Sequence, residues 1–503
     1  MENNNTVFQN PPPQTGQDAP TTHIPPADFL SSPQRPLEQN FSSNLPIQQS
    51  PIPVQNAPQI PINEKPKPNR FPSGIKKLLS ILASVFIVLG LIIVVATFIF
   101  PGLNKNATSG QVTISYWGLF EESTVMQSII SDFQKQNPNI KVEYIKQDVN
   151  QYKDRLTTRI TNGTGPDIFR FHNTWYPMLK NYLLPLPSQT ISQEVFNSIY
   201  YPVMQKDLIK NGAIYGIPLE IDTLSLFINT QLFQSAGVSA PTNWNDFINV
   251  ARAITVKDTE GKIRTAGAAM GTYGNITHAP DIVSLLFLEN GVDFNNFLAS
   301  TDRINEALTF YTSFASGSDG VWNNTLDPSQ LAFAKGNLGM FFGYPNDYFA
   351  IKQFNPNLTF QIVPAPQLPQ QNVALASYWV EGASVNSKHQ REVLLFMKFL
   401  SKKETEQKLY AAQAKVRDFG EPFARVDLAD SLKTNPLVYP FVLQAPNALS
   451  TPFVDQTYDN GLNQQLNTQL ETVINAHQDD GFSQEALTTF IKSVGQTLQQ
   501  YGQ

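Results

Sequence analysis

A run of 23 uncharged, mostly apolar residues, 78–100, constrains this 503-residue chain more than any other feature. As a helix the run would extend about 34 Å, at about 1.5 Å per residue, which is enough to cross a bilayer. A helix buried in a protein core is usually shorter or amphipathic, so the run predicts a transmembrane helix over residues 75–101. Five basic residues closely precede it and only Lys105 closely follows it, which predicts a cytoplasmic N-terminus and an exported C-terminal part. Since the run starts well beyond the usual position of a cleaved signal peptide, we expect an uncleaved signal anchor.

Residues 1–74, which precede this run, have the composition of a disordered tail. The first 70 residues hold 15 of the 37 prolines, together with many Gln, Asn and Ser. Such a segment cannot bury enough apolar surface to offset the entropy lost on ordering. We therefore expect a disordered cytoplasmic tail and, after the membrane span, a short linker at residues 102–110. The tail has too little apolar content to be a kinase or cyclase domain, but a proline-rich segment can dock a partner protein.

The remaining residues, 111–503, alternate strand-like and helix-like patterns. Apolar residues recur at helical spacing from about residues 126, 152, 244, 304 and 462, and strand-like patterns lie near residues 113–117, 140–144, 224–228 and 338–342. This order predicts an α/β fold with mainly parallel strand pairing. The chain is too long for one ordinary domain, so we expect two lobes. Trp244 starts an apolar stripe with Phe247 and Ala251 and is expected in a core.

Several classes of function find no support in the residues. The net charge is -6, with 15% charged residues, so no basic surface for nucleic acid is expected. The absence of cysteine excludes disulfides, thiolate nucleophiles and a lipid-modified N-terminal cysteine. The five histidines are scattered, and neither a serine nucleophile elbow nor a phosphate-binding loop is present. We expect no metal, no cofactor and no enzyme activity, although paired carboxylates for glycoside hydrolysis have no local signature that would exclude them.

The stretch "ITNGTGPDIFRFHNTW", residues 160–175, suggests a place where a ligand is held. Its glycines and proline predict a turn, and the residues from Asp167 to Phe169 begin a short buried strand. His172, Asn173 and Trp175 would then lie at the carboxyl end of that strand, where open α/β sheets bind ligands. The alternative is structural: Asp167 is expected to cap the turn, and Trp175 packing in a core remains open.

At this point the motifs resemble those of the extracellular solute-binding proteins of ABC transporters, family 1, the carbohydrate-binding group that includes maltose-binding proteins. The resemblance covers nearly all of residues 111–503. Its motifs, in family order, are "ISYWGLFEES", "FQKQNPNIKVEYI", "ITNGTGPDIFRFHNTW", "NGAIYGIPLEIDTLSLFINTQLFQSAG", "APTNWNDFINVARAI" and "FAKGNLGMFFGYPNDY". Two features depart from the family: a signal anchor replaces the usual lipoprotein cysteine, and "QAKVRDFGEPFARVDLAD" differs from the family's later glycine-proline stretch.

The resemblance implies a two-lobed, type II periplasmic-binding-protein-like fold that closes about hinge crossings. It implies a first lobe over about 111–222 and 377–445, and a second over about 226–372 with part of the C-terminal helices. It assigns ligand-binding roles to Trp117, Gly118 and Glu121 on the first loop, His172, Asn173 and Trp175 on the second, Asp222 and Thr223 at the first crossing, Thr272 and Tyr273 in "MGTYGN", Gly343, Tyr344 and Asn346 in "FFGYPND", and Trp379, Glu381 and Gly382 at a later crossing.

The expected function is therefore a membrane-anchored, monomeric extracellular protein that captures a mono- or oligosaccharide and delivers it to ABC transporter permease subunits. Aromatic side chains beside Asp, Glu, Asn and His suit a sugar, which offers apolar C–H faces and hydroxyl groups. Two other classes stay open. They are a membrane-anchored sugar sensor or scavenging receptor, and an exported glycoside-active enzyme with two positioned carboxylates.

Overall fold

The computed structural model describes residues 110–480 and 483–502. The tail and transmembrane helix predicted over residues 1–101 lie outside these described residues, as does all but the last residue of the predicted linker. Between residues 110 and 502, in the part that is described, no helix is both long enough and apolar enough to cross a membrane.

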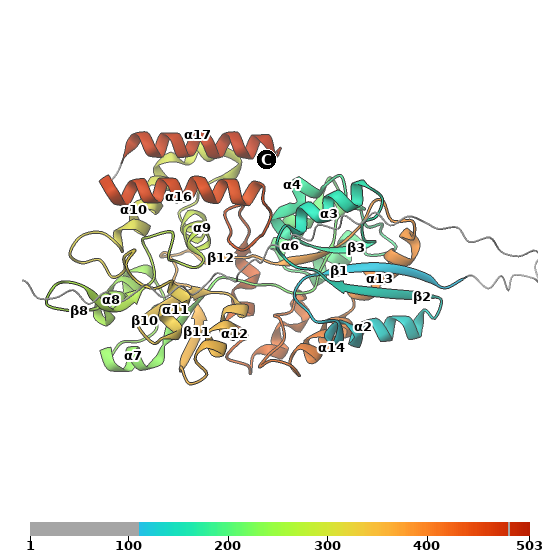
Figure 1. Cartoon of the computed structure of the whole chain (residues 1–503), viewed down its shortest axis with the longest axis horizontal. Helices are drawn as coiled ribbons and strands as arrows, with labels where there is room; N and C mark the ends of the chain where they lie inside the picture. Colours follow the sequence, from blue (N-terminus) through green and yellow to red (C-terminus); the bar gives the residue numbers. More distant parts are fainter. Residues whose placement is uncertain (1–109, 481–482, 503) are drawn as a thin grey trace, which may run out of the picture. The chain divides into compact units, whose positions relative to one another are not determined.

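The described residues form two α/β lobes, each with a five-stranded sheet and its own hydrophobic core (Figure 1). The first lobe contains the sheet β2-β1-β3-β13-β6, and the second contains β11-β7-β10-β9-β8. In the first sheet the strands are β1 (Val112–Gly118), β2 (Ile140–Lys146), β3 (Ile168–His172), β6 (Ile217–Pro218) and β13 (Trp379–Ala383). In the second they are β7 (Ser225–Asn229), β8 (Val256–Lys257), β9 (Ile263–Ala268), β10 (Leu338–Gly343) and β11 (Phe360–Pro364).

The strand pairing is mixed, so the expectation of mainly parallel pairing was wrong. In the first sheet β1 runs parallel to β2 and β3, but β13 is antiparallel to both β3 and β6. In the second sheet β9 and β10 are parallel, and the other pairs are antiparallel. The physical reason is chain path: β13 enters the first sheet after the chain returns from the second lobe, from the opposite end of the sheet.

The helices cover the sheets with the apolar stripes that their sequences carry. The first core is covered by α2 (Ser123–Gln136), α3 (Tyr152–Thr161), α4 (Tyr176–Leu179), α5 (Gln193–Ile199), α6 (Pro202–Leu208), α13 (Gln390–Leu400) and α14 (Lys403–Gln413). Helix α2 buries Met126, Ile129, Ile130 and Phe133, the residues at i, i+3, i+4 and i+7. The periodic pattern therefore predicted this helix correctly.

The second core is covered by α7 (Thr230–Ala236), α8 (Trp244–Ile254), α9 (Ala279–Glu289), α10 (Thr301–Ser313), α11 (Ser329–Ala334), α12 (Pro345–Phe354), α15 (Tyr439–Gln444), α16 (Leu462–Asp480) and α17 (Gln484–Gln500). Trp244 is buried at the start of α8, as expected for a core residue. Its indole contacts Phe247, Phe310 and Phe342. Helices α16 and α17 pack on each other beyond α10 (Figure 1).

Short elements complete the chain. These are the pairs β4 (Ile209–Lys210) with β5 (Ala213–Ile214) and β12 (Ala374–Leu375) with β14 (Ala448–Leu449), and the 3-10 helices η1 (Asn173–Trp175), η2 (Phe294–Ser300), η3 (Val426–Leu432) and η4 (Ala445–Asn447).

Two of the segments that cross between the lobes are hydrogen bonded to each other. Ile221 belongs to the first core and Leu224 to the second, so the first crossing lies between them. The returning segment pairs with it: Leu224 N donates to Leu375 O at 2.9 Å, and Ser377 N donates to Asp222 O at 3.0 Å. These two antiparallel segments form part of the connection between the lobes.

Residues 419–442 depart from the expected division, which assigned 377–445 to the first lobe. Phe419, Phe423 and Phe441 belong to the second core, whereas Ala424 and Ala445 belong to the first. This stretch contains the 3-10 helix η3 and the six-residue helix α15. Such short elements leave too weak a periodic pattern to show from sequence where the chain changes lobes.

Candidate functional site

A cleft of about 190 Å³ lies where the two lobes meet. Its first-lobe wall follows from strand order. Phe120 and Glu121 come after β1, His172 ends β3 and Glu220 follows β6, while antiparallel β13 places Trp379 opposite His172. All of these residues therefore lie at one edge of the sheet, the edge where the parallel strands end.

The second lobe and the connecting segments supply the rest of the cleft. Tyr344 and Asn346 follow β10, and His278 precedes α9. The remaining lining residues are Asp222 and Ser377 on the crossing segments, Arg417 and Glu421 after α14, and Asp455, Gln456 and Tyr458 before α16. Side chains from both lobes thus face one cavity.

Trp379 is the tryptophan among the described residues that line this cleft. Its partly buried indole has edge-to-face contacts with Phe120 at 5.2 Å, His172 at 5.1 Å and Trp175 at 5.4 Å between ring centroids. These neighbours hold the indole in one orientation. Phe120 is 43% exposed, so an apolar face remains open on this side of the cleft.

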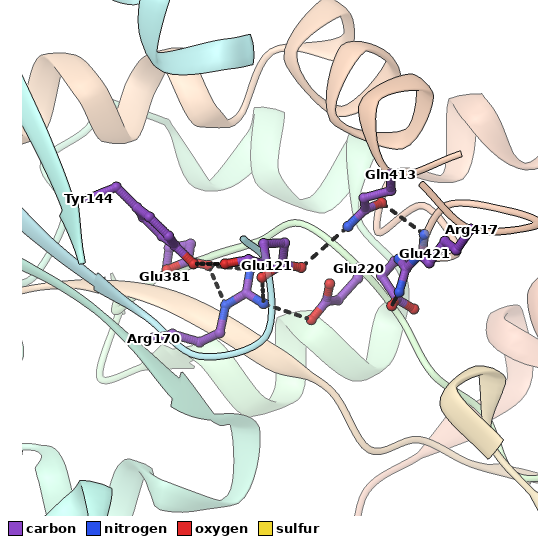
Figure 2. Close-up of polar contacts among 8 residues, drawn as sticks. All are labelled: Glu121, Tyr144, Arg170, Glu220, Glu381, Gln413, Arg417 and Glu421. Carbon is purple, nitrogen blue, oxygen red and sulfur yellow. Dashed lines mark hydrogen bonds and ion pairs between the residues drawn. The ribbon is translucent and has the colours of Figure 1, made fainter. Parts of the chain in front are cut away.

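Behind this wall lies a buried ionic cluster centred on Arg170 (Figure 2). Its guanidinium donates to Glu381 Oε1 and to Glu121 Oε2, each at 2.7 Å, and its Nη1 lies 3.4 Å from Glu220 Oε1. Gln413 extends the cluster, because its Nε2 donates to Glu121 at 3.3 Å and its Oε1 accepts from Glu421 N at 2.9 Å. The cluster fixes Glu121 and Glu220 at the cleft.

Two carboxyl groups of the cleft, those of Glu220 and Asp222, have raised pKa values. Burial raises the pKa of Glu220 well above its usual range, although the Arg170 guanidinium opposes this shift. Burial, together with the Glu421 and Glu220 carboxylates, likewise raises the pKa of Asp222, and Arg417 only partly offsets the effect. Within the described residues Asp222 Oδ1 is buried and has no hydrogen-bond partner. An unpartnered buried oxygen at a cavity is typical of a position that a ligand completes.

A second polar group, around His278, lies on the other wall. Nε2 of His278 lies 2.9 Å from Asp347 Oδ2, and Asp347 also accepts from Tyr344 N at 2.7 Å. Tyr344 donates its hydroxyl to Asp281 Oδ1 at 2.6 Å. Burial lowers the pKa of His278, but the carboxylates of Asp347, Asp281 and Asp455 more than offset this and raise it to about 9. His278 is therefore a cation at neutral pH.

The charge state of His172 differs from that of His278. Its Nδ1 lies 2.8 Å from Thr174 Oγ1 and its Nε2 lies 2.9 Å from Ser377 Oγ. Burial lowers its pKa to about 3, because no carboxylate pairs with the ring among its described contacts. The ring is therefore neutral, and it contributes to the cleft as a polar surface and as a support for Trp379.

Six of the sixteen residues assigned from sequence line the cleft: Glu121, His172, Asp222, Tyr344, Asn346 and Trp379. The other ten lie behind or beside it. Trp117 packs against the first core, and a Cβ atom on Gly118 would overlap the Tyr144 ring. Asn173 hydrogen bonds Asp207, and Trp175 is fully buried in the first core.

The remaining three positions of the first lobe and crossings, and also Asp167, have supporting contacts. Thr223 donates its hydroxyl to Phe441 O at 2.8 Å, between the lobes. Glu381 belongs to the Arg170 cluster, and a Cβ on Gly382 would lie 2.6 Å from Leu183. Asp167 accepts from Ser115 N at 2.8 Å and from Ser387 Oγ at 2.6 Å, so it has the structural role that the sequence favoured.

In the second lobe, Thr272, Tyr273 and Gly343 also support neighbouring elements. Thr272 Oγ1 accepts from Trp322 Nε1 at 3.1 Å, and Tyr273 donates to Asn467 O on α16 at 3.1 Å. A Cβ on Gly343 would lie 2.7 Å from Phe341 and 2.9 Å from Asp347. These residues hold the second wall without lining the cleft.

Nine lining residues were not assigned from sequence: Phe120, Glu220, His278, Ser377, Arg417, Glu421, Asp455, Gln456 and Tyr458. Phe120 and Glu220 adjoin motifs that were recognised, so their neighbours gave a signal. Arg417 and Glu421 belong to the stretch that departs from the family pattern. Gln456 and Tyr458 have positive φ values of 53°, a backbone form that non-glycine residues rarely adopt and that no sequence motif announces.

No group of three or more His, Asp or Glu side chains suited to a metal ion occurs in the described ranges, despite the acidic cleft. The cleft therefore offers hydrogen bonds, charge and aromatic surface.

Residues 117–407, more than half of the chain, match the family described as bacterial extracellular solute-binding protein. This chain belongs to that family. Among related sequences, it is 24% identical to the multiple sugar-binding protein of Streptococcus mutans over 343 residues, which cover 61% of this chain and 76% of the relative.

Solved structures confirm the two-lobed, periplasmic-binding-protein-like fold. The sugar-binding protein MalE from Xanthomonas citri is 20% identical, with a TM-score of 0.63, covering 77% of this chain and 98% of that one. A solute-binding protein of Thermotoga lettingae, solved with α-D-tagatose, is 19% identical, with a TM-score of 0.60, covering 77% and 100%. At these identities the likeness shows the fold of the solute-binding protein alone.

Proposed function

We propose that this solute-binding protein captures a carbohydrate in the cleft between its lobes and performs no chemistry on it. The observation that carries the proposal is the composition of the cleft. Trp379 and Phe120 offer apolar faces for the C–H surface of a sugar ring. Asp222 Oδ1 and two nitrogens of Arg417, Nε and Nη2, are buried without partners among the described residues, and sugar hydroxyls can both donate and accept. Sugar-binding relatives with this fold support the same class of ligand.

Ligand binding would work by favouring closure of the lobes. Trp379 and Glu121 lie on the first wall, and Tyr344 and Asn346 on the second, so one ligand can contact both. A ligand that touches both walls binds the closed arrangement more tightly than the open one and shifts the population toward it. The hydrogen-bonded crossing at Leu224 and Leu375 keeps the lobes connected during this motion.

We further propose that the protein is anchored by residues 78–100 with its binding lobes outside the cell, where it passes the sugar to the permease subunits of an ABC importer. The support is the uncharged run with basic residues before it, together with membership of an extracellular family. The ligand-binding part would act as a monomer. Along the whole chain, the proposed order is tail, anchor, linker and two lobes.

Two alternatives differ in what they would do with the sugar. A sensor or scavenging receptor would bind the sugar but show no importer dependence. A glycoside-active enzyme would cleave it, and the carboxylates of Asp222, Glu220 and Glu421 near one another give this alternative a specific basis. Against it, Glu121, Glu220 and Glu381 all surround Arg170 and so have a structural partner.

The test is a ligand screen by thermal shift on the purified full chain, with mono- and oligosaccharides. A ligand at a hundredfold excess over Kd raises the unfolding free energy by about 2.7 kcal/mol. The proposal predicts a shift with at least one carbohydrate and no shortened products when the mixture is analysed by chromatography after prolonged incubation. Product formation would favour the enzyme, and the absence of any carbohydrate-induced shift would contradict the proposed function.

Topology is tested separately on intact cells. Added protease should remove the binding lobes and leave an epitope in residues 1–74 protected. Removal of that epitope would show that the orientation is the reverse of the one proposed.

A further inference from the structure

The cleft has more negative than positive side chains. Five carboxylates line it, from Glu121, Glu220, Asp222, Glu421 and Asp455. Arg417 and His278 are the cationic side chains on its described lining, and Arg170 lies just behind. A site for a neutral ligand can contain carboxylates, but each is then usually balanced by a cation or by hydrogen-bond donors.

The cationic side chains in and behind the cleft already pair with carboxylates of the protein. Arg170 contacts three carboxylates, one of which is Glu381 behind the cleft. Arg417 Nη1 pairs with Glu421 Oε1 at 2.6 Å. His278 lies 2.9 Å from Asp347, and its other ring nitrogen lies 3.7 Å from Asp455. Each cation therefore has at least one carboxylate beside it, and Asp222 has no salt-bridge partner among the described residues.

Asp222 is the side chain that most needs a positive partner. Its Oδ1 is buried and unpartnered, while the rest of the side chain lines the cavity. The neighbouring Glu421 and Glu220 carboxylates disfavour its ionised form, and the raised pKa is consistent with that geometry. A cation placed here would complete the hydrogen bonding of Oδ1 and relieve the repulsion among the three carboxylates.

Arg417 needs hydrogen-bond acceptors from the ligand, whereas Asp222 needs a donor or a cation. Its Nε and Nη2 atoms are buried and have no acceptor within the described part of the chain. A simple polyamine offers donors but no acceptors, so it would leave these two groups unsatisfied. A sugar carries hydroxyl and ring oxygens, and these can accept from the guanidinium.

We propose that the ligand is an amine-bearing sugar, whose ammonium group pairs with Asp222 and whose hydroxyl oxygens accept from Arg417. The inference rests on the proposed function, since it specifies which carbohydrates the same cleft takes. The ring of such a sugar lies against Trp379 and Phe120, and its ammonium group faces the carboxylates of Asp222, Glu220 and Glu421. A charge-assisted pair with a buried carboxylate is about twice as strong as a neutral hydrogen bond, so selection between amino and neutral sugars follows from this contact.

The experiment compares matched ligands by titration calorimetry on the purified full chain, near pH 7, where an amine is still largely protonated and the Asp222 carboxyl, whose pKa is raised, is less readily protonated than in acid. The amino ligands are glucosamine, galactosamine, mannosamine and the β-1,4-linked dimer and trimer of glucosamine. Each is paired with its neutral hydroxyl parent and with its N-acetylated form, which keeps the nitrogen but removes the charge. Spermidine is the control for charge without a sugar ring.

Two variants connect the preference to the cleft. Asp222→Asn keeps the shape of the side chain and removes its charge. Asp319→Asn removes one negative charge from an exposed loop of the second lobe and serves as the matched control. We expect at least one amino sugar to bind at least about tenfold more tightly than its neutral parent and its N-acetylated form. That advantage should disappear in Asp222→Asn and persist in Asp319→Asn.

The other outcomes overturn the inference in distinguishable ways. If neutral sugars bind as tightly as amino sugars, the amine-bearing ligand is wrong and the proposed carbohydrate function stands. If Asp222→Asn leaves the preference for amino sugars intact, the pairing of the ammonium group with Asp222 is wrong. Tight binding of spermidine without any sugar, or no binding of any carbohydrate, would contradict both the inference and the proposed function.

Discussion

Trp175 and Trp379 meet edge to face, with ring centroids 5.4 Å apart, yet only Trp379 reaches the cleft. Trp175 is fully buried, beside Tyr152 in the first core. The two tryptophans were assigned the same role from sequence. Their positions predict different roles, because one indole faces the ligand and the other supports it from behind.

Replacing each tryptophan by alanine should separate these roles. Trp175→Ala removes a buried indole and should lower the free energy of unfolding by about 3 to 5 kcal/mol. Trp379→Ala should cost less stability but weaken carbohydrate binding by at least the roughly 0.5 to 1.5 kcal/mol of an aromatic pair. Urea denaturation and titration calorimetry measure the two effects. Equal stability losses in both variants, with affinity unchanged in Trp379→Ala, would place the ligand elsewhere.

Removing the Arg170 guanidinium should be strongly destabilising. Arg170→Met leaves the carboxylates of Glu121, Glu220 and Glu381 buried without their cation, and breaking a buried ion pair in this way costs about 3 to 5 kcal/mol. The pKa of Glu381 is already raised by burial and rises further without Arg170. A carboxyl with a raised folded-state pKa stabilises the fold at low pH and loses that contribution as pH rises, so the variant should be least stable, relative to the native chain, near neutral pH.

The double variant Arg170→Met with Glu381→Gln provides the control for this interpretation. It removes the charge of Glu381, one of the carboxylates left without Arg170, so it should recover part of the lost stability. Denaturation across acidic and neutral pH measures both variants. A stability loss that does not depend on pH, with no recovery in the double variant, would mean that packing rather than charge explains the effect.

His278 should make stability fall as pH rises above neutral. Its pKa is about 9 in the folded protein against 6.5 for an ordinary histidine, since Asp347, Asp281 and Asp455 outweigh the effect of burial. A raised histidine pKa stabilises the fold fully below about pH 6.5, and the contribution is lost as pH rises through about 9, with a magnitude on the order of 3 kcal/mol. Burial also raises the pKa of Asp281 to about 7 and raises the pKa values of Glu220 and Asp222, so these carboxyls add their own pH dependence in the same range. The difference in stability between the native chain and a variant without His278 therefore isolates the contribution of His278.

His278→Asn is the suitable variant, because His278 has a φ of 63° and asparagine tolerates this left-handed backbone. The variant should be less stable than the native chain at about pH 6, and this difference in stability should shrink as pH rises from about 7 to 9. Thermal denaturation in a series of buffers measures this. A native chain with constant stability across that interval would contradict the His278–Asp347 ion pair.

A substitution at Gly118 should weaken ligand binding indirectly, by displacing the side chain of Tyr144, which does not line the cleft. A Cβ atom at this position would overlap the ring and hydroxyl of Tyr144, and Tyr144 donates to Glu121 O at 2.9 Å. Gly118→Ala should displace Tyr144, move the loop that carries Phe120 and Glu121, and cost about 1 to 3 kcal/mol of stability from overpacking. Gly274→Ala, where a Cβ would meet open space, is the control. An affinity unchanged in Gly118→Ala would show that the loop position is independent of Tyr144.

The sequence predicted the elements with strong local patterns. Helices α2, α3, α10 and α16 bury the apolar positions expected from their periodicity, and β7 and β10 correspond to the short apolar runs. Whether each of these segments forms a helix or a strand depends on residues close to it in the sequence. The pairing direction of β13 depends on a return from the other lobe, and no local pattern encodes it.

The candidate site was predicted less completely for the same reason. Trp379 and Asp222 were found because they adjoin recognisable motifs, whereas Arg417 and Tyr458 reach the cleft from long loops without regular spacing. From sequence alone Trp175 and Trp379 had the same expected role, because no local pattern shows that Trp175, in the 3-10 helix η1, is fully buried while Trp379, in β13, reaches the cleft. A contact made across more than two hundred residues has no signature within a short window.

The position of β13 between β3 and β6 has a consequence for the synthesis of this protein. Arg170 and Glu381, bonded neighbours across β3 and β13, are 211 residues apart in the chain. At about 5 to 20 residues per second, a ribosome needs roughly 10 to 40 s to make the intervening segment. During that time the nascent first lobe lacks a central strand, and the edges of β3 and β6 have no partner. The sheet that carries Trp379 is thus completed only late in translation, after the second lobe has been synthesised.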